Sequence, residues 1–269
     1  MFAFYLYTNV AKKKLFCKEF EFMNLIIDDG NTFVKLYIVE NNTVLARKKF
    51  RYVDNKQAAD IIRDFLLPFN IEQAGLVSVG GKQALLSEIL NNYDFQLHII
   101  DWRSDIPVKN LYSTPQTLGM DRLAAAVGAN YLYPNENLLI IDIGSAITYD
   151  IVTENNEYLG GNISPGVEFR FRALNDYTSS LPYIEPSKIE NKVGRSTKEA
   201  INNGVILGVL YELQGYIIDF QENYDKLRTI LTGGGAKFFE KKIKNSIFVQ
   251  LDLVPIGLNH ILTHKRNFN

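Results

Sequence analysis

The sequence predicts a duplicated α/β fold, and three observations support this. The segment LIIDDG at residues 25–30 recurs as LIIDIG at residues 139–144, identical at five positions and displaced by 114 residues from Asp28 to Asp142. Each copy continues into small polar residues and a second apolar run, which is typical of a strand, a tight Asp-x-Gly turn and another strand. Hydrophobic residues form 46% of the chain, enough for a sizeable core.

The elements of the first half follow from local patterns. We expect the glycine of each repeated turn to supply backbone freedom and to allow a close approach that a side chain would block. After the first hairpin, residues 74–80 predict a buried strand, residues 83–90 a short helix that follows a Gly-Gly turn, and residues 95–100 a further strand. These alternating elements are typical of an α/β domain.

The second half is predicted in the same way. Residues 121–133 form a small-residue helix pattern that ends at Pro134 and could cross closely between the halves. Ser196 and Glu199 have the spacing of a capping box and open a long helix that extends to about residue 220. A strand at 227–231, a glycine-rich break at 232–235 and a helix near 236 complete the pattern, and such breaks allow a nucleotide to approach the backbone.

Composition excludes several classes of protein. The chain has 29 Lys and Arg against 30 Asp and Glu, a formal net charge of −1, which argues against a basic nucleic-acid surface. No apolar stretch approaches the roughly 18 to 20 residues that span a bilayer, so we expect a soluble protein that does not act in a membrane. One cysteine, Cys17, excludes an internal disulfide framework, and the reducing cytoplasm is the simplest compartment.

Length suggests one or two domains. We expect an N-terminal extension of uncertain status over 1–22, with an extra strand or helix as the alternative, because Met23 directly precedes the first strand pattern. A first domain is then expected over 23–120 and a second over 121–269.

Two Asp-x-Gly turns that face each other could bind a polyphosphate. Their N–H groups and hydroxyls suit phosphate oxygens, and the carboxylates of Asp28 and Asp142 could hold cations. This arrangement resembles the actin-like ATPase and sugar kinase superfamily, which implies duplicated actin-like (ribonuclease H-like) ATPase domains with an ATP cleft between them. A kinase also needs a group that accepts the proton of the acceptor hydroxyl. Asp121 is the candidate, although from spacing alone it could equally be a helix cap paired with Arg122.

Six ordered motifs give a more specific resemblance. The chain resembles type III pantothenate kinases from residue 24 to about residue 260. The motifs are Asp28-x-Gly30-Asn31-Thr32-x-x-Lys35, Gly119-x-Asp121-Arg122, Asp142-x-Gly144-Ser145-Ala146-x-Thr148, Gly160-Gly161-x-Ile163-x-Pro165-Gly166, Gly194-Arg195-x-Thr197 and Thr232-Gly233-Gly234.

The resemblance implies ATP-dependent phosphorylation of pantothenate to 4′-phosphopantothenate, the first step of coenzyme A biosynthesis. It implies Asp121 as the general base, Asp28 as the residue that holds ATP through Mg²⁺, and Asp142 as the ligand of a monovalent cation, K⁺ or NH₄⁺. Ser145 stands where the family usually has threonine and keeps the hydroxyl. The implied ATP-binding residues are Asp28, Asp29, Gly30, Asn31, Thr32, Phe33, Val34, Lys35, Ser145, Gly233 and Gly234. The implied pantothenate-binding residues are Tyr112, Gly119, Met120, Asp121, Arg122 and Thr197.

Two questions stay open at this stage. The resemblance implies a homodimer, and Gly204, Gly208 and Gly215 could allow close helix packing, either between subunits or within one chain. The alternative functions are a kinase of the same superfamily that acts on a sugar or another small alcohol, and a non-catalytic relative that binds nucleotide and acts as a regulatory or accessory factor. The retained acids favour an enzyme.

Overall fold

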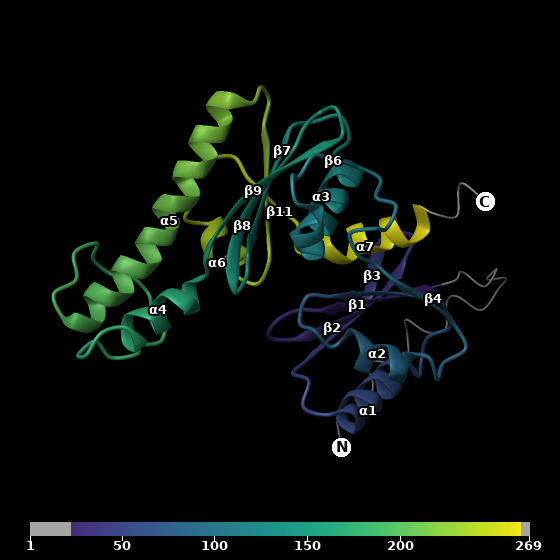
Figure 1. Ribbon diagram of the computed structural model, residues 1–269. Coiled ribbons are helices and arrows are strands. Elements are labelled where there is room, and N and C mark those ends of the chain that lie inside the picture. Colours follow the sequence, from purple (N-terminus) through teal and green to yellow (C-terminus); the bar gives the residue numbers. More distant parts are fainter. Residues whose placement is uncertain (1–22, 265–269) are drawn as a thin grey trace, which may run out of the picture.

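The structure, a computed structural model, describes residues 23–264, so the predicted extension over residues 1–22 lies outside the described residues. The described chain forms two β-sheets, with helices between them and on their outer faces (Figure 1). Three hydrophobic clusters fill the space between the sheets and the spaces under the outer helices.

Sheet A and the two helices that cover it come from the first half of the chain. The elements are β1 (Met23–Asp29), β2 (Val34–Glu40), β3 (Thr43–Phe50), α1 (Asn55–Leu66), β4 (Ile71–Ser78), α2 (Gln83–Leu90) and β5 (Gln96–Ile99). The strand order is β3-β2-β1-β4-β5, with β1 antiparallel to β2 and parallel to β4. Side chains alternate along β1, so Leu25 and Ile27 pack against α1 and α2 while Ile26 faces the space between the sheets.

Sheet B repeats this arrangement. It contains β7 (Leu138–Ile143), β8 (Ala146–Val152), β9 (Glu157–Pro165), β10 (Arg228–Thr232) and β11 (Phe248–Val249), with the short β6 (Lys109–Asn110) added beside β9. The order β9-β8-β7-β10-β11 corresponds strand by strand to β3-β2-β1-β4-β5, and the corresponding pairs have the same relative directions. The predicted duplication is therefore confirmed, and with it a fold of two ribonuclease H-like halves, as in actin-like ATPases.

Helices α3 (Met120–Leu132) and α7 (Leu253–His264) lie between the two sheets and pack against each other. Two glycines permit the close approach. A Cβ on Gly128 would overlap the carbonyl oxygen of Leu253, and one on Gly257 would overlap that of Ala124. The small-residue helix predicted between the halves is therefore confirmed as α3. Its partner α7 is not among the predicted elements.

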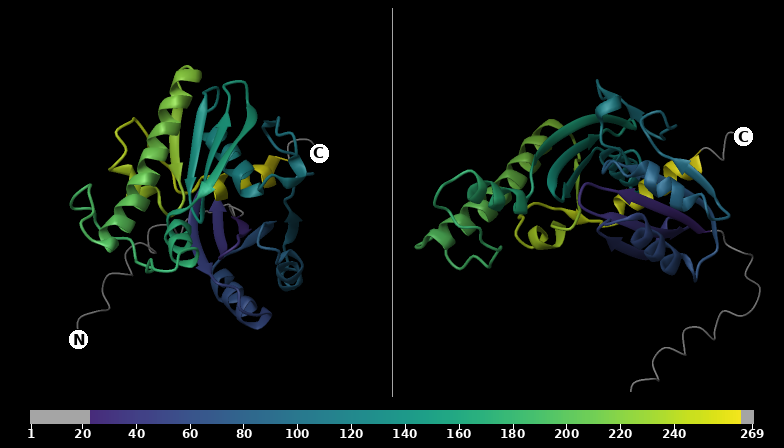
Figure 2. Two further views of the ribbon diagram at one scale, coloured as in Figure 1. Left: turned by 60° about the vertical axis from the view of Figure 1, so that its left-hand side comes forward. Right: turned by 60° about the horizontal axis from the view of Figure 1, so that its bottom comes forward.

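A lobe projects from the body of the molecule beside sheet B (Figures 1 and 2). It contains α4 (Val167–Asp176), the loop after it and the first part of α5 (Thr197–Asn223). Ser196 caps α5 as predicted, accepting a hydrogen bond from the N–H of Glu199, but the Glu199 carboxylate accepts from the N–H of Arg195 and not from that of Ser196. The apolar face predicted for α5 is buried, with exposures of at most 6%: Ile201, Val205, Val209, Leu213 and Ile217.

The remaining elements are the 3₁₀ helix η2 (Pro115–Thr117) and α6 (Ala236–Glu240), which begins where a helix is expected. Helix α2 matches its predicted range, and the strands predicted at 74–80, 95–100 and 227–231 are β4, β5 and β10. The division of the chain at residue 120 stays a prediction, although β6 precedes that point and joins sheet B. Among residues 23–264, no helix combines the length and the apolar character that a bilayer span requires.

Candidate active site

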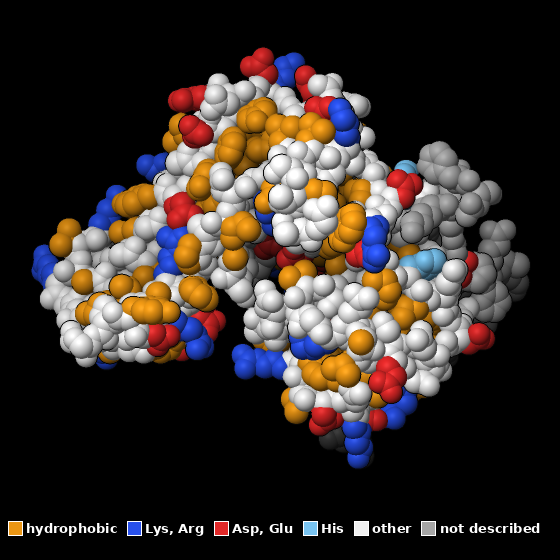
Figure 3. Space-filling model, in the orientation of Figure 1, with side chains coloured by type: hydrophobic (Ala, Val, Ile, Leu, Met, Phe, Trp, Pro, Cys, Tyr) orange, Lys and Arg blue, Asp and Glu red, His pale blue; other side chains and the backbone are white. Residues whose placement is uncertain are grey.

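The aspartates of the two repeated turns lie at corresponding ends of the central strands. Asp28 is on the face of β1 that carries Ile26, and Asp142 is on the face of β7 that carries Ile140. Because side chains alternate along a strand, both carboxylates point toward the layer between the sheets. Acidic side chains are visible in the hollow between the two halves (Figure 3). The structure therefore brings the two predicted cation ligands to one cleft.

Asp28 forms an ion pair with Lys35, its neighbour on β2. The Lys35 Nζ lies 2.7 Å from Asp28 Oδ2, and the Asp28 side chain is only 3% exposed. Burial raises the pKa of Asp28, and the carboxylates of Asp121 and Asp29 add to the rise against the opposing charge of Lys35. Burial would lower the pKa of Lys35, but the charge of Asp28 raises it. Lys35 therefore stays a cation beside the cleft.

The turn between β1 and β2 is tight without unusual backbone angles. The Gly30 N–H donates to the Phe33 carbonyl at 3.1 Å, and Asn31 and Thr32 are exposed at the tip. The expectation that the turn glycines supply backbone freedom is wrong, because neither Gly30 nor Gly144 has a positive φ. A Cβ on Gly30 would stand 4.0 Å from Asp28 Oδ1. A Cβ here would make only ordinary contacts, so crowding within the chain does not require glycine either.

Asp142 lies under the glycine-rich loop that follows β10. Gly233 has a φ of +82°, and a Cβ there would overlap Asp142 Oδ1, so this position requires glycine for both reasons. Burial raises the pKa of Asp142 to about 6; Lys35 opposes the rise, and the carboxylates of Asp121 and Asp28 add to it. Ser145, three residues after Asp142, and Gly234, which follows Gly233, are both exposed. The second turn therefore presents a carboxylate with little compensating charge.

Asp29 has a different environment from Asp28. It is fully buried, and its carboxylate accepts hydrogen bonds from the Ser78 hydroxyl and from both the N–H and the Nζ of Lys82. The backbone carbonyl of Asp29 also accepts from the N–H groups of Val79 and Gly80. The carboxylate of Asp29, a predicted ATP-binding residue, thus holds the loop after β4.

Asp121 is the second residue of α3 and is half-buried. Its Oδ1 accepts a hydrogen bond from the backbone N–H of Arg122 at 2.9 Å. A Cβ on Gly119 would stand 2.5 Å from this oxygen, so glycine leaves room for the carboxylate. The charge of Asp121 acts on both Asp28 and Asp142, which places it in the same cleft.

The guanidinium of Arg122 binds Asp150, a residue of β8, and not Asp121. Arg122 Nη2 lies 2.6 Å from Asp150 Oδ1, Nε lies 3.1 Å from the same oxygen, and both side chains are nearly inaccessible. The hydroxyl of Tyr158 donates to Asp150 Oδ1 at 2.7 Å. The alternative in which the side chains of Asp121 and Arg122 pair is therefore wrong.

Tyr112 lies beside this buried pair. Its ring centroid is 5.7 Å from the guanidinium carbon of Arg122 and 6.4 Å from the ring of Tyr158. Gly160 has a φ of +107°, and a Cβ there would stand 2.8 Å from the Tyr112 ring, so glycine fits both the backbone and the tyrosine. The structure therefore groups Tyr112, Gly119, Met120, Asp121 and Arg122 at the start of α3.

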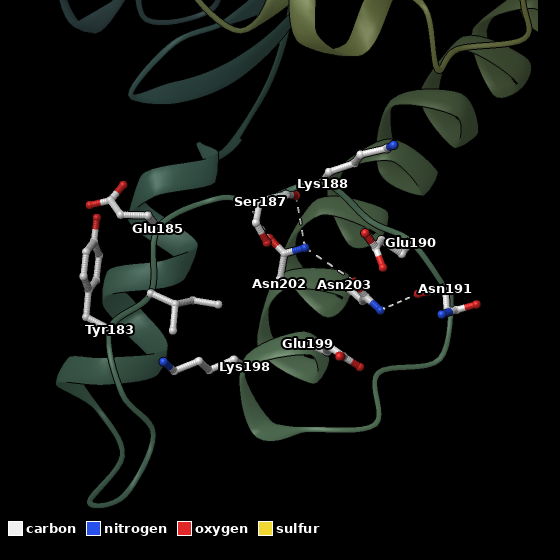
Figure 4. Close-up of a pocket in the computed structure, with 11 residues that line it drawn as sticks. Tyr183, Glu185, Ser187, Lys188, Glu190, Asn191, Lys198, Glu199, Asn202 and Asn203 are labelled. Atoms are coloured by element: carbon white, nitrogen blue, oxygen red, sulfur yellow. Dashed lines mark hydrogen bonds between the residues drawn. The ribbon is translucent and has the colours of Figure 1, made fainter.

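Thr197 is the predicted site residue that the single chain does not bring to this group. It is exposed at the first turn of α5, in the projecting lobe. Two buried asparagines fix the loop next to it (Figure 4): Asn202 bonds to both backbone groups of Ser187, and Asn203 donates to the carbonyl of Asn191. A cavity of about 550 Å³ lies between this loop and α5, apart from the aspartates of the cleft.

Comparison with known proteins identifies the family. A family model described as type III pantothenate kinase matches residues 24–219. The chain is 40% identical over 242 residues to the type III pantothenate kinase of Phocaeicola vulgatus and 39% identical over 244 residues to that of Porphyromonas gingivalis. Each match covers 90% of this chain and 98% of the relative. This chain belongs to the type III pantothenate kinase family.

Solved structures agree with the fold of this type III pantothenate kinase family member. A Baf family protein from Campylobacter jejuni has a TM-score of 0.57 at 22% identity and covers 91% of this chain and 100% of its own. The ethanolamine utilization protein EutJ from Carboxydothermus hydrogenoformans has a TM-score of 0.50 at 17% identity, with 88% of each chain covered. At these identities the likeness concerns the fold alone.

Asp150 is the residue of this pantothenate kinase family site that the sequence patterns did not predict. A signal was present, because an aspartate stands between Tyr149 and Ile151 in a run expected to form a strand. A charge in such a position needs a partner, which the strand pattern alone does not name.

Proposed function

We propose that this chain transfers the γ-phosphoryl group of ATP to pantothenate, which gives 4′-phosphopantothenate and begins coenzyme A synthesis. The observation that carries the proposal is the arrangement of Asp121, Asp28 and Asp142 around one cleft in a chain of this family. A reaction that consumes ATP fits the cytoplasm.

ATP would bind along the turn between β1 and β2. Lys35 would neutralise phosphate charge, and the exposed Asn31 and Thr32 would donate hydrogen bonds to phosphate oxygens. Gly233 and Gly234 would approach the nucleotide from sheet B, with Ser145 beside it. Phe33 and Val34 complete the turn. The Nζ of Lys49 lies 3.8 Å from the ring centroid of Phe33.

The residues present fit a divalent cation bound together with ATP. Within residues 23–264, no three acidic, histidine or cysteine side chains converge into a ready-made metal site. Mg²⁺ usually takes one or two carboxylates and completes its shell with phosphate oxygens and water. Asp28 is the carboxylate that would hold it, and its burial-raised pKa indicates that added positive charge is favourable there. The ion would supply charge neutralisation on the phosphates.

Asp121 would act as general base. As the pantothenate hydroxyl oxygen forms a bond to the γ-phosphorus, the bond from that phosphorus to the ADP oxygen breaks and the hydroxyl proton passes to the Asp121 carboxylate. Gly119 leaves this carboxylate uncovered. The start of α3 would frame the acceptor through Tyr112, Met120 and the backbone of Arg122.

Asp142 would bind the monovalent cation, K⁺ or NH₄⁺. Its carboxylate is partly buried and has little compensating charge, in line with its raised pKa of about 6. A monovalent cation would stabilise the ionised form of this carboxylate. The cation would then lie next to the ATP phosphates, which Gly233 and Gly234 are proposed to approach.

We propose that the working unit is a homodimer formed through α5. Gly204, Gly208, Tyr211, Gly215 and Ile218 repeat at intervals of four and three residues, which places them on one side of the helix. A Cβ on any of the three glycines would meet nothing within 4 Å, so packing within the chain does not require them. Tyr211 is 54% and Ile218 49% exposed.

The same stripe explains the position of Thr197. Thr197 lies seven residues before Gly204, which itself lies seven before Tyr211, so all three share one side of α5. If this side meets a second copy, Thr197 of one copy would reach the acceptor site of the other. This arrangement accounts for a pantothenate-contacting residue that is exposed and remote in the single chain.

The decisive experiment is a substrate panel. Purified protein with ATP and Mg²⁺ is given pantothenate or one of several sugars, with and without K⁺ or NH₄⁺, and ADP formation and phosphorylated product are measured. We expect phosphopantothenate only with pantothenate, and faster with the monovalent cation. Product from a sugar alone would support the sugar kinase alternative, and ATP binding without any product would support a regulatory relative.

A further inference from the structure

Asp150 is a buried carboxylate that none of the proposed steps uses. It is 1% exposed, and its Oδ1 accepts three hydrogen bonds, from Nε and Nη2 of Arg122 and from the hydroxyl of Tyr158. A carboxylate so enclosed does not contact a substrate. We infer that Asp150 is a positioning residue, which holds the catalytic Asp121 in place through Arg122.

Arg122 links the two aspartates. Its backbone N–H donates to Asp121 Oδ1, while its guanidinium is held by Asp150 on β8. Helix α3 begins at Met120, and its N-cap residue Gly119 has no side chain to cap the helix, so a side-chain cap does not fix the first turn. The ion pair to sheet B therefore fixes it, and with it the acceptor oxygen of Asp121.

The same carboxylate orders the wall of the acceptor site. Tyr158 donates to Asp150 and packs beside Tyr112, and the Arg122 guanidinium faces the Tyr112 ring. Gly160 makes room for Tyr112. One buried carboxylate thus connects the proposed base with the proposed pocket tyrosine.

Stability alone does not explain this arrangement. Replacing a buried ion pair by apolar side chains of the same volume is often neutral or stabilising, so such pairs are weak evidence for a stabilising role. Catalysis by positioning is far more demanding, since a displacement of about 1 Å can cost about 100-fold in rate. The inference rests on the proposed function, because the base must be aimed at an acceptor hydroxyl.

The test compares Asp150→Asn and Tyr158→Phe with the wild type. The Asp150→Asn change would keep an oxygen for Tyr158 but lose the charge that holds Arg122. We therefore expect kcat with pantothenate to fall about 10- to 100-fold, with the KM for ATP within about twofold of wild type, because the hydrogen-bond partners of Asp150 are Arg122 and Tyr158 and not residues of the turn at Asp28. Tyr158→Phe keeps the ion pair, so we expect a smaller fall in kcat.

The control is Glu136→Gln. It breaks a bidentate pair with Arg228 at the opposite end of the strands of sheet B, so we expect an unchanged kcat. Wild-type kcat in Asp150→Asn, or an equal loss in Glu136→Gln, would overturn the inference. If Asp150→Asn does not fold, an unchanged kcat in Tyr158→Phe would overturn it.

A second readout does not depend on the reaction. In a crystal structure of Asp150→Asn, or of Tyr158→Phe if the first variant does not fold, we expect the Asp121 carboxylate to be displaced from its wild-type position. An unmoved Asp121 would contradict the inference. The wild-type assay with pantothenate tests the proposed function separately, so an inactive wild type would refute that function without deciding the role of Asp150.

Discussion

The aspartates of the two repeated turns differ in what balances their charge. Asp29 is satisfied by Ser78 and Lys82, and Asp28 has Lys35. Asp142 has no comparable partner among the described residues, and burial raises its pKa to about 6. At the scale of the residue, the two turns therefore hold one carboxylate committed to structure, one paired with a cation of the chain, and one, Asp142, that is the proposed ligand of a cation from solution.

The raised pKa of Asp142 makes the stability of the cation-free protein depend on pH. The carboxyl has an ordinary pKa of 3.8 and a folded value of about 6, so between these values the folded chain binds the additional proton. The free energy of unfolding therefore falls as pH rises through this window, and the loss is complete above it. We expect Asp142→Asn to stabilise the protein by about 1–3 kcal/mol at pH 7.5 without K⁺, while removing the stimulation by K⁺.

Urea denaturation of both proteins at pH 7.5 and at pH 3.5 measures this effect. The difference between variant and wild type should nearly vanish at the lower pH, where the wild-type carboxyl is protonated in the folded state and mostly protonated in the unfolded state. A variant that is less stable than wild type at pH 7.5 would contradict the prediction.

Gly119 gives a second prediction at this scale. A Cβ there would stand 2.5 Å from Asp121 Oδ1, and the side chain would have to move. We expect Gly119→Ala to lower kcat about 10- to 100-fold while ATP binding, measured by calorimetry, stays near wild type because the phosphate turn is untouched. Equal losses of ATP affinity and kcat would show that the substitution disturbs the cleft as a whole.

At the scale of the element, α5 has two faces with different tasks. The buried face, which includes Val205, Val209 and Leu213, holds sheet B, and this face was predictable from its periodicity. The opposite stripe carries three glycines at which an added Cβ would meet nothing within 4 Å. A helix that carries these glycines and two exposed large apolar side chains on one stripe is suited to a close partner.

We expect Gly208→Leu to convert the dimer into a monomer, because a large side chain would prevent two helices from approaching at this point. Light scattering coupled to gel filtration gives the mass, and turnover should fall with dimer content. Gln214→Leu, which adds a similar side chain off the stripe, is the matched control and should remain dimeric. A wild type that is monomeric under assay conditions yet active would contradict the dimer proposal.

At the scale of the whole molecule, the sequence could predict what local patterns specify. The two strand–turn–strand units, α2, α3 and α5 follow from repeats, periodicity and capping residues within short windows. The helix α7, which packs on α3, and the strand β9 were not predicted, because their places in the fold depend on contacts with distant parts of the chain. A role for Asp150 could not be predicted because its partners are distant in the chain or brought close by a turn. Arg122 lies 28 residues earlier, and the hairpin between β8 and β9 places Tyr158 beside Asp150.

The sequence also predicted which residues gather at the candidate site, but not all of their contacts. The motif residues Asp28, Lys35, Asp121 and Asp142 lie around one cleft, as expected. Neither the backbone angles nor crowding within the chain requires glycine at position 30, which only coordinates reveal. Roles for these residues stay predictions that kinetics must test.

The measurement that tests the central claim most directly is the kcat of Asp121→Asn with pantothenate and ATP. The change keeps the size of the side chain and the acceptor for the Arg122 N–H but removes the base. We expect kcat to fall by about 100-fold or more, with the melting temperature and ATP affinity nearly unchanged. Asp54→Asn, which alters the cap of α1 on the far side of sheet A, should keep wild-type turnover. Normal turnover in Asp121→Asn would contradict the account.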